Sequence, residues 1–202
     1  MSVKPINIGV VGVGHLGIHH VKHYTTIPNV NLLGIYDPDV KRSNYVANEY
    51  KTVAFQSLKK LIENVDALSI VTPTPNHYKT AKLCIENKKH VFIEKPITVT
   101  LEEANELLDL SKNNSTIIQV GHIERLNPAL MALEPYYINP KFIEIQRLAP
   151  YTVRGTDVPV VLDKMIHDID ILLSLVKSEV ASLEATGMSI ITNSLDMAHA
   201  RI

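Results

Sequence analysis

Cysteine is almost absent from this sequence, and its scarcity narrows the classes of protein to which the chain can belong. The one cysteine among 202 residues, Cys84, excludes an intramolecular disulfide framework and a zinc site of the CxxC type. We therefore expect a reducing, cytoplasmic compartment. Long apolar runs are also missing. None approaches the ~18 residues that a membrane-spanning helix needs, so we expect no membrane partner.

Neither sign of charge is in excess. The sequence has 20 Lys plus Arg and 21 Asp plus Glu, which gives a formal net charge of −1. A general nucleic-acid-binding surface needs a basic excess to neutralise phosphates, so we expect no nucleic-acid partner. Apolar residues make up 46% of the chain, which is too many for a disordered protein of such small net charge. The length corresponds to about one and a third average domains.

Short apolar runs alternate with amphipathic stretches through the first 120 residues. The expected strands cover residues 6–11, 30–36, 53–55, 67–71, 90–93 and 116–120. The expected helices cover residues 15–26, 40–50, 58–64, 77–87 and 101–112, with Asn76 as a candidate cap of the fourth and Thr100 of the fifth. This alternation is typical of a parallel, doubly wound α/β sheet with right-handed crossovers. We therefore expect a doubly wound α/β domain over residues 1–120.

The strongest local motif is Gly12-x-Gly14-x-x-Gly17, directly after the first strand and at the start of the first helix. The first glycine permits a tight turn, the second lets a pyrophosphate approach the backbone, and the third lets the helix pack close to the strand. The helix N-terminus supplies free N–H groups and partial positive charge for the phosphates. The motif in this context predicts dinucleotide binding; the alternative is a simple glycine turn.

An acidic residue at the end of the second strand bears on the choice of cofactor. Asp37 follows Gly12 by 25 residues, close to the spacing of about 20 that is typical of the acid that binds the adenosine ribose. Its carboxylate would repel a 2′-phosphate, so NAD(H) is favoured, with NADP(H) as the alternative. Lys41 and Arg42 lie nearby and weaken this preference. Asp37 could also serve only to cap the following helix.

The regular alternation of strand and helix patterns ends at Gly121. We expect a short helix over residues 128–133, a strand over 141–148, a helix over 160–176, a strand over 180–191 and the start of another strand over 197–202. Two or three strands and one good helix cannot close a buried sheet. We therefore expect an incomplete α/β domain over residues 121–202, with an unpaired strand edge unless something covers it.

Three further motifs follow the glycine loop. VTPTPNH covers residues 71–77, EKP covers residues 94–96, and DxxxHD covers residues 163–168. In this order and spacing they resemble the Gfo/Idh/MocA oxidoreductase family over the whole chain from Ile6 onward. The segments GHIERLNPAL and APYTVRGTDVPVVLDKMIHDIDILL are similar to members that oxidise nucleotide sugars.

The resemblance implies a fold and an activity. The family has a Rossmann domain followed by an α/β domain with a large, mostly antiparallel sheet, whose face often forms an oligomer interface; this chain would end inside that second domain. The implied activity is NAD(P)-dependent hydride transfer between a nicotinamide cofactor and a carbohydrate hydroxyl or ketone, with nucleotide sugars as the narrower expectation. The implied partners are a sugar substrate and further copies of the chain. The alternative is a non-catalytic dinucleotide-binding sensor or a truncated remnant.

Asp163, His167 and Lys95 are the candidate catalytic residues. Asp163 and His167 are four residues apart, so on a helix they share one face, where a carboxylate can orient an imidazole that takes a proton. A solvent-facing pair is the alternative, and the resemblance favours the catalytic role. Lys95 ends a strand at the edge where such sheets bind ligands, and could stabilise an alkoxide or hold a ribose hydroxyl. The alternative for Lys95 is a surface turn, and the Lys95–Pro96 bond is a candidate for the cis form.

The remaining site candidates are contacts to cofactor and substrate. The expected cofactor contacts are Gly12, Gly14, His15, Leu16, Gly17, Asp37, Thr72, Pro73, Asn76, His77, Glu94 and Lys95. The expected substrate contacts are His122, Arg125, Tyr151, Arg154 and Thr156. For Arg125 an ion pair at a domain interface is an equal alternative, and for His77 a helix start without a role.

Histidine clusters raise the question of a metal site, and we expect none. His19, His20 and His23 lie close together in the first helix, but no carboxylate or cysteine in the sequence is obviously placed to complete a site. The simpler interpretation is a polar helix face. Hydride transfer to a nicotinamide needs no metal, so a site built from Asp163, His167 and His122 is also rejected.

Overall fold

The computed structural model describes residues 4–136, 138–150 and 158–202. The chain forms two compact units, Met1–Gly121 and His122–Ile202. No helix within the described ranges is long and apolar enough to cross a membrane.

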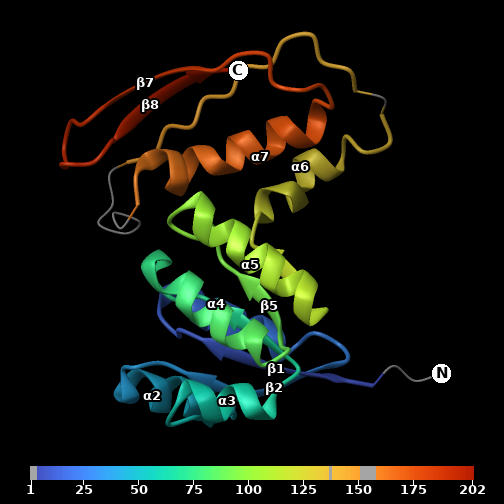
Figure 1. Ribbon diagram of the computed structural model, residues 1–202, viewed down its shortest axis with the longest axis vertical. Helices are drawn as coiled ribbons and strands as arrows, with labels where there is room; N and C mark the ends of the chain where they lie inside the picture. Colours follow the sequence, from blue (N-terminus) through green and yellow to red (C-terminus); the bar gives the residue numbers. More distant parts are fainter. Residues whose placement is uncertain (1–3, 137, 151–157) are drawn as a thin grey trace. The chain divides into compact units, whose positions relative to one another are not determined.

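The N-terminal unit is built on one parallel sheet (Figure 1). Its strands are β1 (Ile6–Val11), β2 (Val30–Tyr36), β3 (Val53–Ala54), β4 (Ala67–Ile70), β5 (His90–Ile93) and β6 (Ile118–Val120). Their order is β3-β2-β1-β4-β5-β6, and every neighbouring pair is parallel. The order reverses beside β1, and at such a switch point the loops at the carboxyl ends of the strands leave a crevice for ligands. The predicted doubly wound sheet is confirmed.

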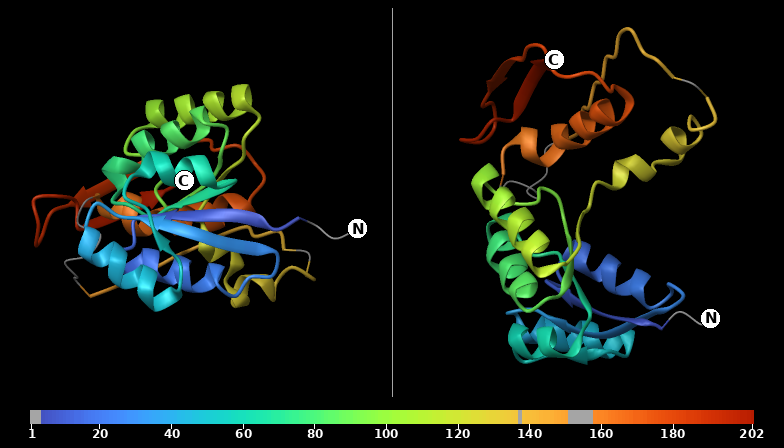
Figure 2. Two further views of the ribbon diagram at one scale, coloured as in Figure 1. Left: turned by 90° about the horizontal axis from the view of Figure 1, so that it is seen from below. Right: turned by 45° about the vertical axis from the view of Figure 1, so that its right-hand side comes forward.

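Helices cover both faces of this sheet (Figure 2). They are α1 (His15–Tyr24), α2 (Val40–Tyr50), α3 (Leu58–Asn64), α4 (His77–Glu86) and α5 (Leu101–Asn114). One buried cluster contains side chains of α3, α4 and α5, and a second contains side chains of α1 and α2. The first two helices therefore cover one face and the next three the other. Because all strands are parallel, the carboxyl ends of β1, β4 and β5 lie at one edge of the sheet.

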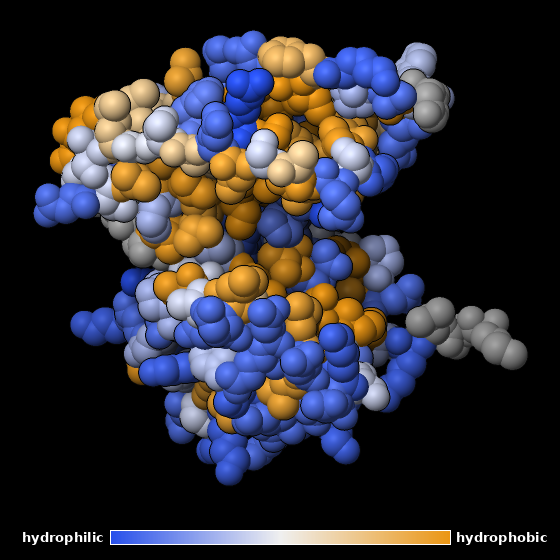
Figure 3. All heavy atoms as spheres, turned by 45° about the horizontal axis from the view of Figure 1, so that its top comes forward, coloured by the Kyte–Doolittle hydropathy of each residue, from blue (hydrophilic) through white to orange (hydrophobic). Residues whose placement is uncertain are grey.

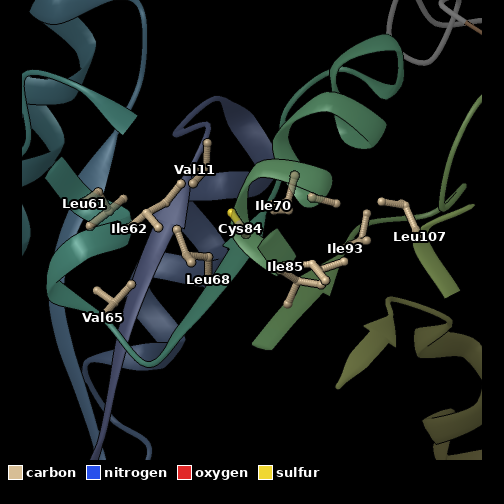
Figure 4. Close-up of a cluster of buried hydrophobic side chains, with 12 residues drawn as sticks. Val11, Leu61, Ile62, Val65, Leu68, Ile70, Cys84, Ile85, Ile93 and Leu107 are labelled. Atoms are coloured by element: carbon tan, nitrogen blue, oxygen red, sulfur yellow. The ribbon is translucent and has the colours of Figure 1, made fainter. Parts of the chain in front are cut away.

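The larger apolar cluster surrounds the central strands (Figure 4). Leu68 and Ile70 of β4 pack there with Ile85 and Cys84 of α4, and the last three are fully buried. Burial raises the pKa of the Cys84 thiol to about 12, so the thiol is protonated at neutral pH. Cys84 is therefore an apolar core residue, as the apolar face of its helix predicts.

Local capping fixes where three of the helices begin. Asp39, Ser57 and Thr100 accept hydrogen bonds from the backbone N–H groups of Arg42, Lys60 and Glu103. Each bond satisfies a donor that has no partner within its helix. The expected cap at Asn76 is wrong, because its side chain makes no such bond and a 3-10 turn, η1 (Thr74–Asn76), leads into α4 instead.

The C-terminal unit has short helices and one pair of strands within the described residues. Its elements are η2 (Ile123–Leu126), α6 (Pro128–Met131), the π-helical η3 (Val161–Met165), α7 (Ile166–Leu175), β7 (Glu184–Met188) and β8 (Met197–Arg201). β7 and β8 form an antiparallel pair. The strand predicted over residues 141–148 is wrong, because 138–150 carry no regular secondary structure. Alternating apolar residues do not make a strand without a hydrogen-bonded neighbour, and β7 and β8 pair only with each other among the described residues.

Candidate active site

The glycine loop leaves the carboxyl end of β1 as a turn that only glycine fits at two positions. Gly12 has φ +86°, and a Cβ atom there would lie 2.7 Å from the carbonyl oxygen of Val71. A Cβ at Gly17 would overlap the carbonyl oxygen of Gly12. A Cβ at Gly14, by contrast, would have nothing within 4 Å. The loop is therefore tight against the protein at both ends and open at its middle residue, where a ligand can reach the backbone.

At the N-terminus of α1, the helix that follows the loop, no side chain accepts a hydrogen bond from the first backbone N–H groups. Gly14 is the N-cap of α1, no side chain caps the helix, and its first turn has no acidic residue. His15 and Leu16, in that first turn, are exposed. Unsatisfied N–H groups and the helix dipole favour an anion at this place. The cradle therefore fits a pyrophosphate.

Asp37 fastens the glycine loop to the end of β2. Its Oδ2 accepts a hydrogen bond from the backbone N–H of Val13 at 2.8 Å, and its Oδ1 accepts one from the N–H of Asp39 at 2.9 Å. Arg42 Nη1 lies 3.7 Å from Oδ2, and only 6% of the Asp37 side chain is exposed. Each carboxylate oxygen has a second lone pair, so the group keeps capacity for a ribose hydroxyl.

A cavity of about 130 Å³ lies beside Asp37 at the carboxyl ends of β2 and β3. Its lining residues are Tyr36, Asp37, Pro38, Val40, Ser43, Asn44, Ala54, Phe55 and Gln56. Ser43 Oγ is buried there and has no hydrogen-bond partner within the described structure. The mixture of aromatic, aliphatic and a few polar groups is typical of a pocket for a small organic ligand.

The turns after β4 and β5 are joined by a buried histidine. His77 is 1% exposed, and its Nδ1 and Nε2 lie 2.9 Å and 2.8 Å from the carbonyl oxygens of Pro96 and Thr72. Thr72 Oγ1 is buried without a hydrogen-bond partner in the described part of the chain. The predicted cis bond between Lys95 and Pro96 is present. Lys95 is partly buried on this turn, whereas Pro73 and Asn76 are exposed.

Glu94, the residue before Lys95, is held by a side chain from α1. His20 Nε2 lies 3.0 Å from Glu94 Oε1, and His20 Nδ1 lies 2.8 Å from Ser69 Oγ. Burial alone would raise the pKa of Glu94, but the hydrogen bond and charge of His20, with the backbone N–H and charge of Lys95, outweigh burial and lower it. Glu94 is therefore a carboxylate at neutral pH.

Asp163 and His167 lie on the continuous helical stretch formed by η3 and α7. Asp163 falls within the π-helical turn and His167 in the first turn of α7. One turn of either helix type brings residues four apart to nearly the same face, so the predicted shared face stands. Asp163 Oδ2 also lies 3.2 Å from Lys164 Nζ. π-Helical turns within helices are frequent at functional sites.

Two arginines form ion pairs with the aspartates that follow His167 in the chain. Arg125 donates to both oxygens of Asp170 at 2.7 Å and 2.6 Å, and this bond lowers the pKa of Asp170. His122 Nδ1 lies 3.9 Å from Asp170. Arg147 donates in the same way to Asp168.

The paired state of Arg125 favours its predicted alternative, an ion pair, although the pair lies within the C-terminal unit. The other substrate candidates, Tyr151, Arg154 and Thr156, lie outside the described residues.

Sequence reasoning missed His20, which it treated as part of a polar helix face. His19 and His23 are exposed as expected, but His20 is turned toward the sheet. Its position on α1, three residues from the buried Gly17 and one from the buried Val21, was the available signal. No group of three His, Cys, Asp or Glu side chains in the described ranges is arranged to hold a metal ion.

The fold and the loop together define a dinucleotide-binding domain of the Rossmann class. The family described as "Oxidoreductase family, NAD-binding Rossmann fold", Gfo/Idh/MocA, matches residues 6–122. The chain belongs to the Gfo/Idh/MocA oxidoreductase family.

Several relatives share the fold and sequence over nearly the whole chain. UDP-N-acetylglucosamine 3-dehydrogenase from Acidithiobacillus ferrooxidans is 39% identical over 193 residues, which are 95% of this chain and 61% of that protein. Its solved structure, named GnnA, has a TM-score of 0.92 at 38% identity and covers 98% of this chain and 63% of that one. The scyllo-inositol 2-dehydrogenase (NAD(+)) of Bacillus subtilis is 30% identical over 90% of this chain and 57% of its own length. This chain thus spans about three fifths of these relatives.

Proposed function

We propose that this protein is an NAD(P)-dependent dehydrogenase that interconverts a hydroxyl and a ketone on a carbohydrate, with a nucleotide sugar as substrate. The observation that carries the proposal is the glycine cradle, where the uncapped N-terminus of α1 opens at Gly14 and Gly12 packs against the turn after β4. A relative 39% identical over almost the whole chain is named for oxidation of UDP-N-acetylglucosamine, which supports the substrate class.

The N-terminal unit would bind the cofactor in three places. The N–H groups at Gly14, His15 and Leu16 would hold the pyrophosphate. Asp37 would accept from the adenosine ribose, and the cavity beside it would take the adenine. Thr72 Oγ1, which lacks a partner in the described structure, would bond to the cofactor near the turn after β4. Of the remaining candidates, Gly12 and Gly17 shape the loop, and Pro73 and Asn76 are exposed at its neighbouring turn.

Three side chains, of His167, Asp163 and Lys95, would move the proton and stabilise the charges. A bound nicotinamide cofactor would supply the hydride acceptor for oxidation of the carbon that bears the reacting hydroxyl to a ketone. His167 takes the hydroxyl proton, and Asp163 on the same helix face stabilises the imidazolium that results. The ammonium of Lys95 stabilises negative charge that develops on the oxygen. Reduction runs the same steps in reverse.

The preference for NAD(H) over NADP(H) rests on Asp37. Its buried carboxylate lies where a 2′-phosphate would approach, and the repulsion disfavours NADP(H). Arg42 is engaged by both Asp37 and Asp39, at 3.7 Å and 3.3 Å, so its charge is partly neutralised before a cofactor arrives. This pairing reduces the attraction that a free guanidinium would offer to a 2′-phosphate.

The sheet of the C-terminal unit would also mediate contact between copies. β7 is exposed along its whole length, and apolar residues such as Leu183 and Met188 are more than half exposed. Burial of this surface against a second copy would stabilise a homo-oligomer. The free, protonated thiol of Cys84 suits a reducing cytoplasm.

The first test is a titration of the protein with NADH and NADPH, followed by nicotinamide fluorescence. We expect saturable binding, with NADH bound more tightly. Turnover of UDP-N-acetylglucosamine with NAD would then establish the dehydrogenase activity. Binding without turnover of any sugar substrate would favour the non-catalytic sensor or remnant, and no binding of either cofactor would overturn the proposal.

A further inference from the structure

Lys95 lies between two neighbours in the chain that are each fixed by a histidine. Glu94, before it, meets His20 of α1, and Pro96, after it, meets His77 of α4. The two histidines come from helices in the two different buried clusters, on the two faces of the sheet. The turn that carries Lys95 is therefore held from both sides.

The contact with His20 forms a polar chain inside an apolar interface. Ser69 is fully buried on β4, and the rings of His20 and Phe92 meet edge to face at 5.6 Å. His20 spans the space between Ser69 and Glu94 with both ring nitrogens. Tyr24 also faces this group: burial raises the pKa of its hydroxyl, which also bonds to Ser69 and feels the Glu94 charge. Because well-packed apolar residues could hold α1 against the sheet equally well, stability alone gives little reason for buried charge here.

Glu94 passes this restraint directly to its neighbour. Its Oε2 accepts a hydrogen bond from the backbone N–H of Lys95 at 3.3 Å, and its carboxylate lies against Gly121, where a Cβ would come within 3.1 Å of Oε1. The Glu94 carboxylate is thus confined by His20 on one side and by the end of β6 on the other. A side chain so confined fixes the backbone from which Lys95 projects.

His77 restrains the other side of the turn. Its ring is almost wholly buried and bridges the carbonyl oxygens of Thr72 and Pro96. These carbonyls belong to the turns after β4 and β5, and the first of the two turns packs against Gly12 of the glycine loop. His77 therefore sets the spacing between the phosphate loop and the lysine turn.

We propose that His20 and His77 are positioning residues that together fix Lys95 relative to the glycine loop. The proposal rests on the proposed function of Lys95, but it concerns a geometry that can be measured without turnover. Neither histidine acts on substrate or cofactor. Each works through a neighbour of Lys95, His20 through the Glu94 carboxylate and His77 through the Pro96 carbonyl.

The experiment measures the environment of the Lys95 ammonium directly. The lysines of the whole chain are reductively methylated with ¹³C-formaldehyde, and the Lys95 signal is assigned by its loss in Lys95→Arg. We expect the Lys95 signal to move in His20→Leu and His77→Leu, to return most of the way in His20→Gln, and to stay in place in His23→Gln. His23 is the matched control, because it lies exposed on the same helix. An unmoved Lys95 signal in both leucine variants would overturn the proposal.

Circular dichroism reports whether each variant folds. If His20→Leu does not fold, Glu94→Gln replaces it. Glu94→Gln keeps the shape but removes the charge, so it must move the Lys95 signal, and an unmoved signal overturns the proposal in the same way.

NADH titration supplies the second measurement. His20→Leu should weaken NADH binding roughly tenfold, the loss that one charge-assisted hydrogen bond accounts for. In a Lys95→Met background the same change should have little further effect, since the two residues act as one unit. An equal loss in both backgrounds would mean that His20 supports the fold rather than Lys95. Failure of the parent to bind NADH would overturn the proposed function, while the lysine spectra would still decide the positioning role.

Discussion

The two units of the chain are stabilised in different ways. In the N-terminal unit, strands and helices enclose two clusters of fully or nearly fully buried apolar side chains. In residues 122–202, Val158 is the one apolar side chain classed as buried within the described ranges, and many large apolar residues are exposed. Apolar side chains gather on the visible face of this second unit (Figure 3). The first unit has a core of its own, and the second presents its apolar surface outward.

In the second unit, hydrogen-bonded ion pairs contribute more to holding the helix in position. Arg125 and Arg147 each donate to both carboxylate oxygens of an acid in the helix of His167, namely Asp170 and Asp168. Such forks fix orientation as well as distance. The comparison indicates that burial of apolar side chains stabilises the N-terminal unit. The helix that carries the proposed base, by contrast, is held in position by ion pairs.

The largest expected effect separates the chemical roles of the two units. His167→Ala should lower turnover of UDP-N-acetylglucosamine by about 10²–10⁴-fold, since it removes the proton acceptor. Its affinity for NADH should stay within about twofold of the parent, because the cradle lies in the other unit. Steady-state kinetics and nicotinamide fluorescence measure the two quantities. Unchanged turnover would remove His167 from the mechanism.

The next effect tests the packed core of the first unit. Ile85 on α4 is fully buried. Ile85→Ala should lower the free energy of unfolding by about 2–5 kcal/mol, from lost apolar burial and the cavity left behind. Urea unfolding followed by circular dichroism measures the change. A loss below ~1 kcal/mol would show that this core is less well packed than the buried clusters indicate.

A smaller effect tests the ion pairs of the second unit. Asp170→Asn removes the charged acceptor of Arg125, whose side chain is 57% exposed and remains solvated, so we expect a loss of about 2 kcal/mol or less. Because Arg125 lowers the pKa of Asp170, the stabilisation is full above its ordinary value of 3.8 and is lost as the pH falls through the lowered value. Urea unfolding across acidic pH should therefore show a weaker pH dependence in Asp170→Asn. An identical pH profile would exclude the pair as a contributor.

The smallest effect lies at an exposed apolar residue of the second unit. Leu148 is 90% exposed, so Leu148→Ser should change the free energy of unfolding by less than about 0.5 kcal/mol. Because the substitution removes exposed apolar surface, we expect weaker self-association, measured as a lower apparent mass in light scattering. A large loss of stability would show that Leu148 is covered in solution.

The contrast between the units also decides how far the sequence could predict the structure. In residues 4–121 the central strands are largely buried and the helices each bury one side, so the local apolar pattern indicates most elements correctly. The parallel, doubly wound sheet, the glycine loop and the cis bond before Pro96 were all expected. In residues 141–148 the same kind of alternation failed, because a strand depends on a partner that the local sequence does not reveal.

Prediction of the candidate site from the sequence meets the same limit. The spacing of the glycine motif was enough to single out Gly12, whereas Lys95 and His167 were singled out by the resemblance to the family. The contacts of His20 and Arg125 could not be singled out, since each depends on a partner far along the chain, Glu94 in the first case and Asp170 in the second. Long-range pairing of polar side chains is set by the fold, not by the neighbouring sequence.

The carboxylate of Asp37 carries a consequence for any attempt to redesign the cofactor preference. Because its Oδ2 accepts a hydrogen bond from the N–H of Val13, the carboxylate that we propose to repel a 2′-phosphate also tethers the phosphate loop. Asp37→Ala would remove the proposed repulsion and the hydrogen bond to the loop at the same time. Any gain in affinity for NADP(H) would then be offset by a less ordered phosphate loop. A side chain that still accepts a hydrogen bond without a charge, such as Asn or Ser, offers a route in which selectivity and loop order can be changed separately.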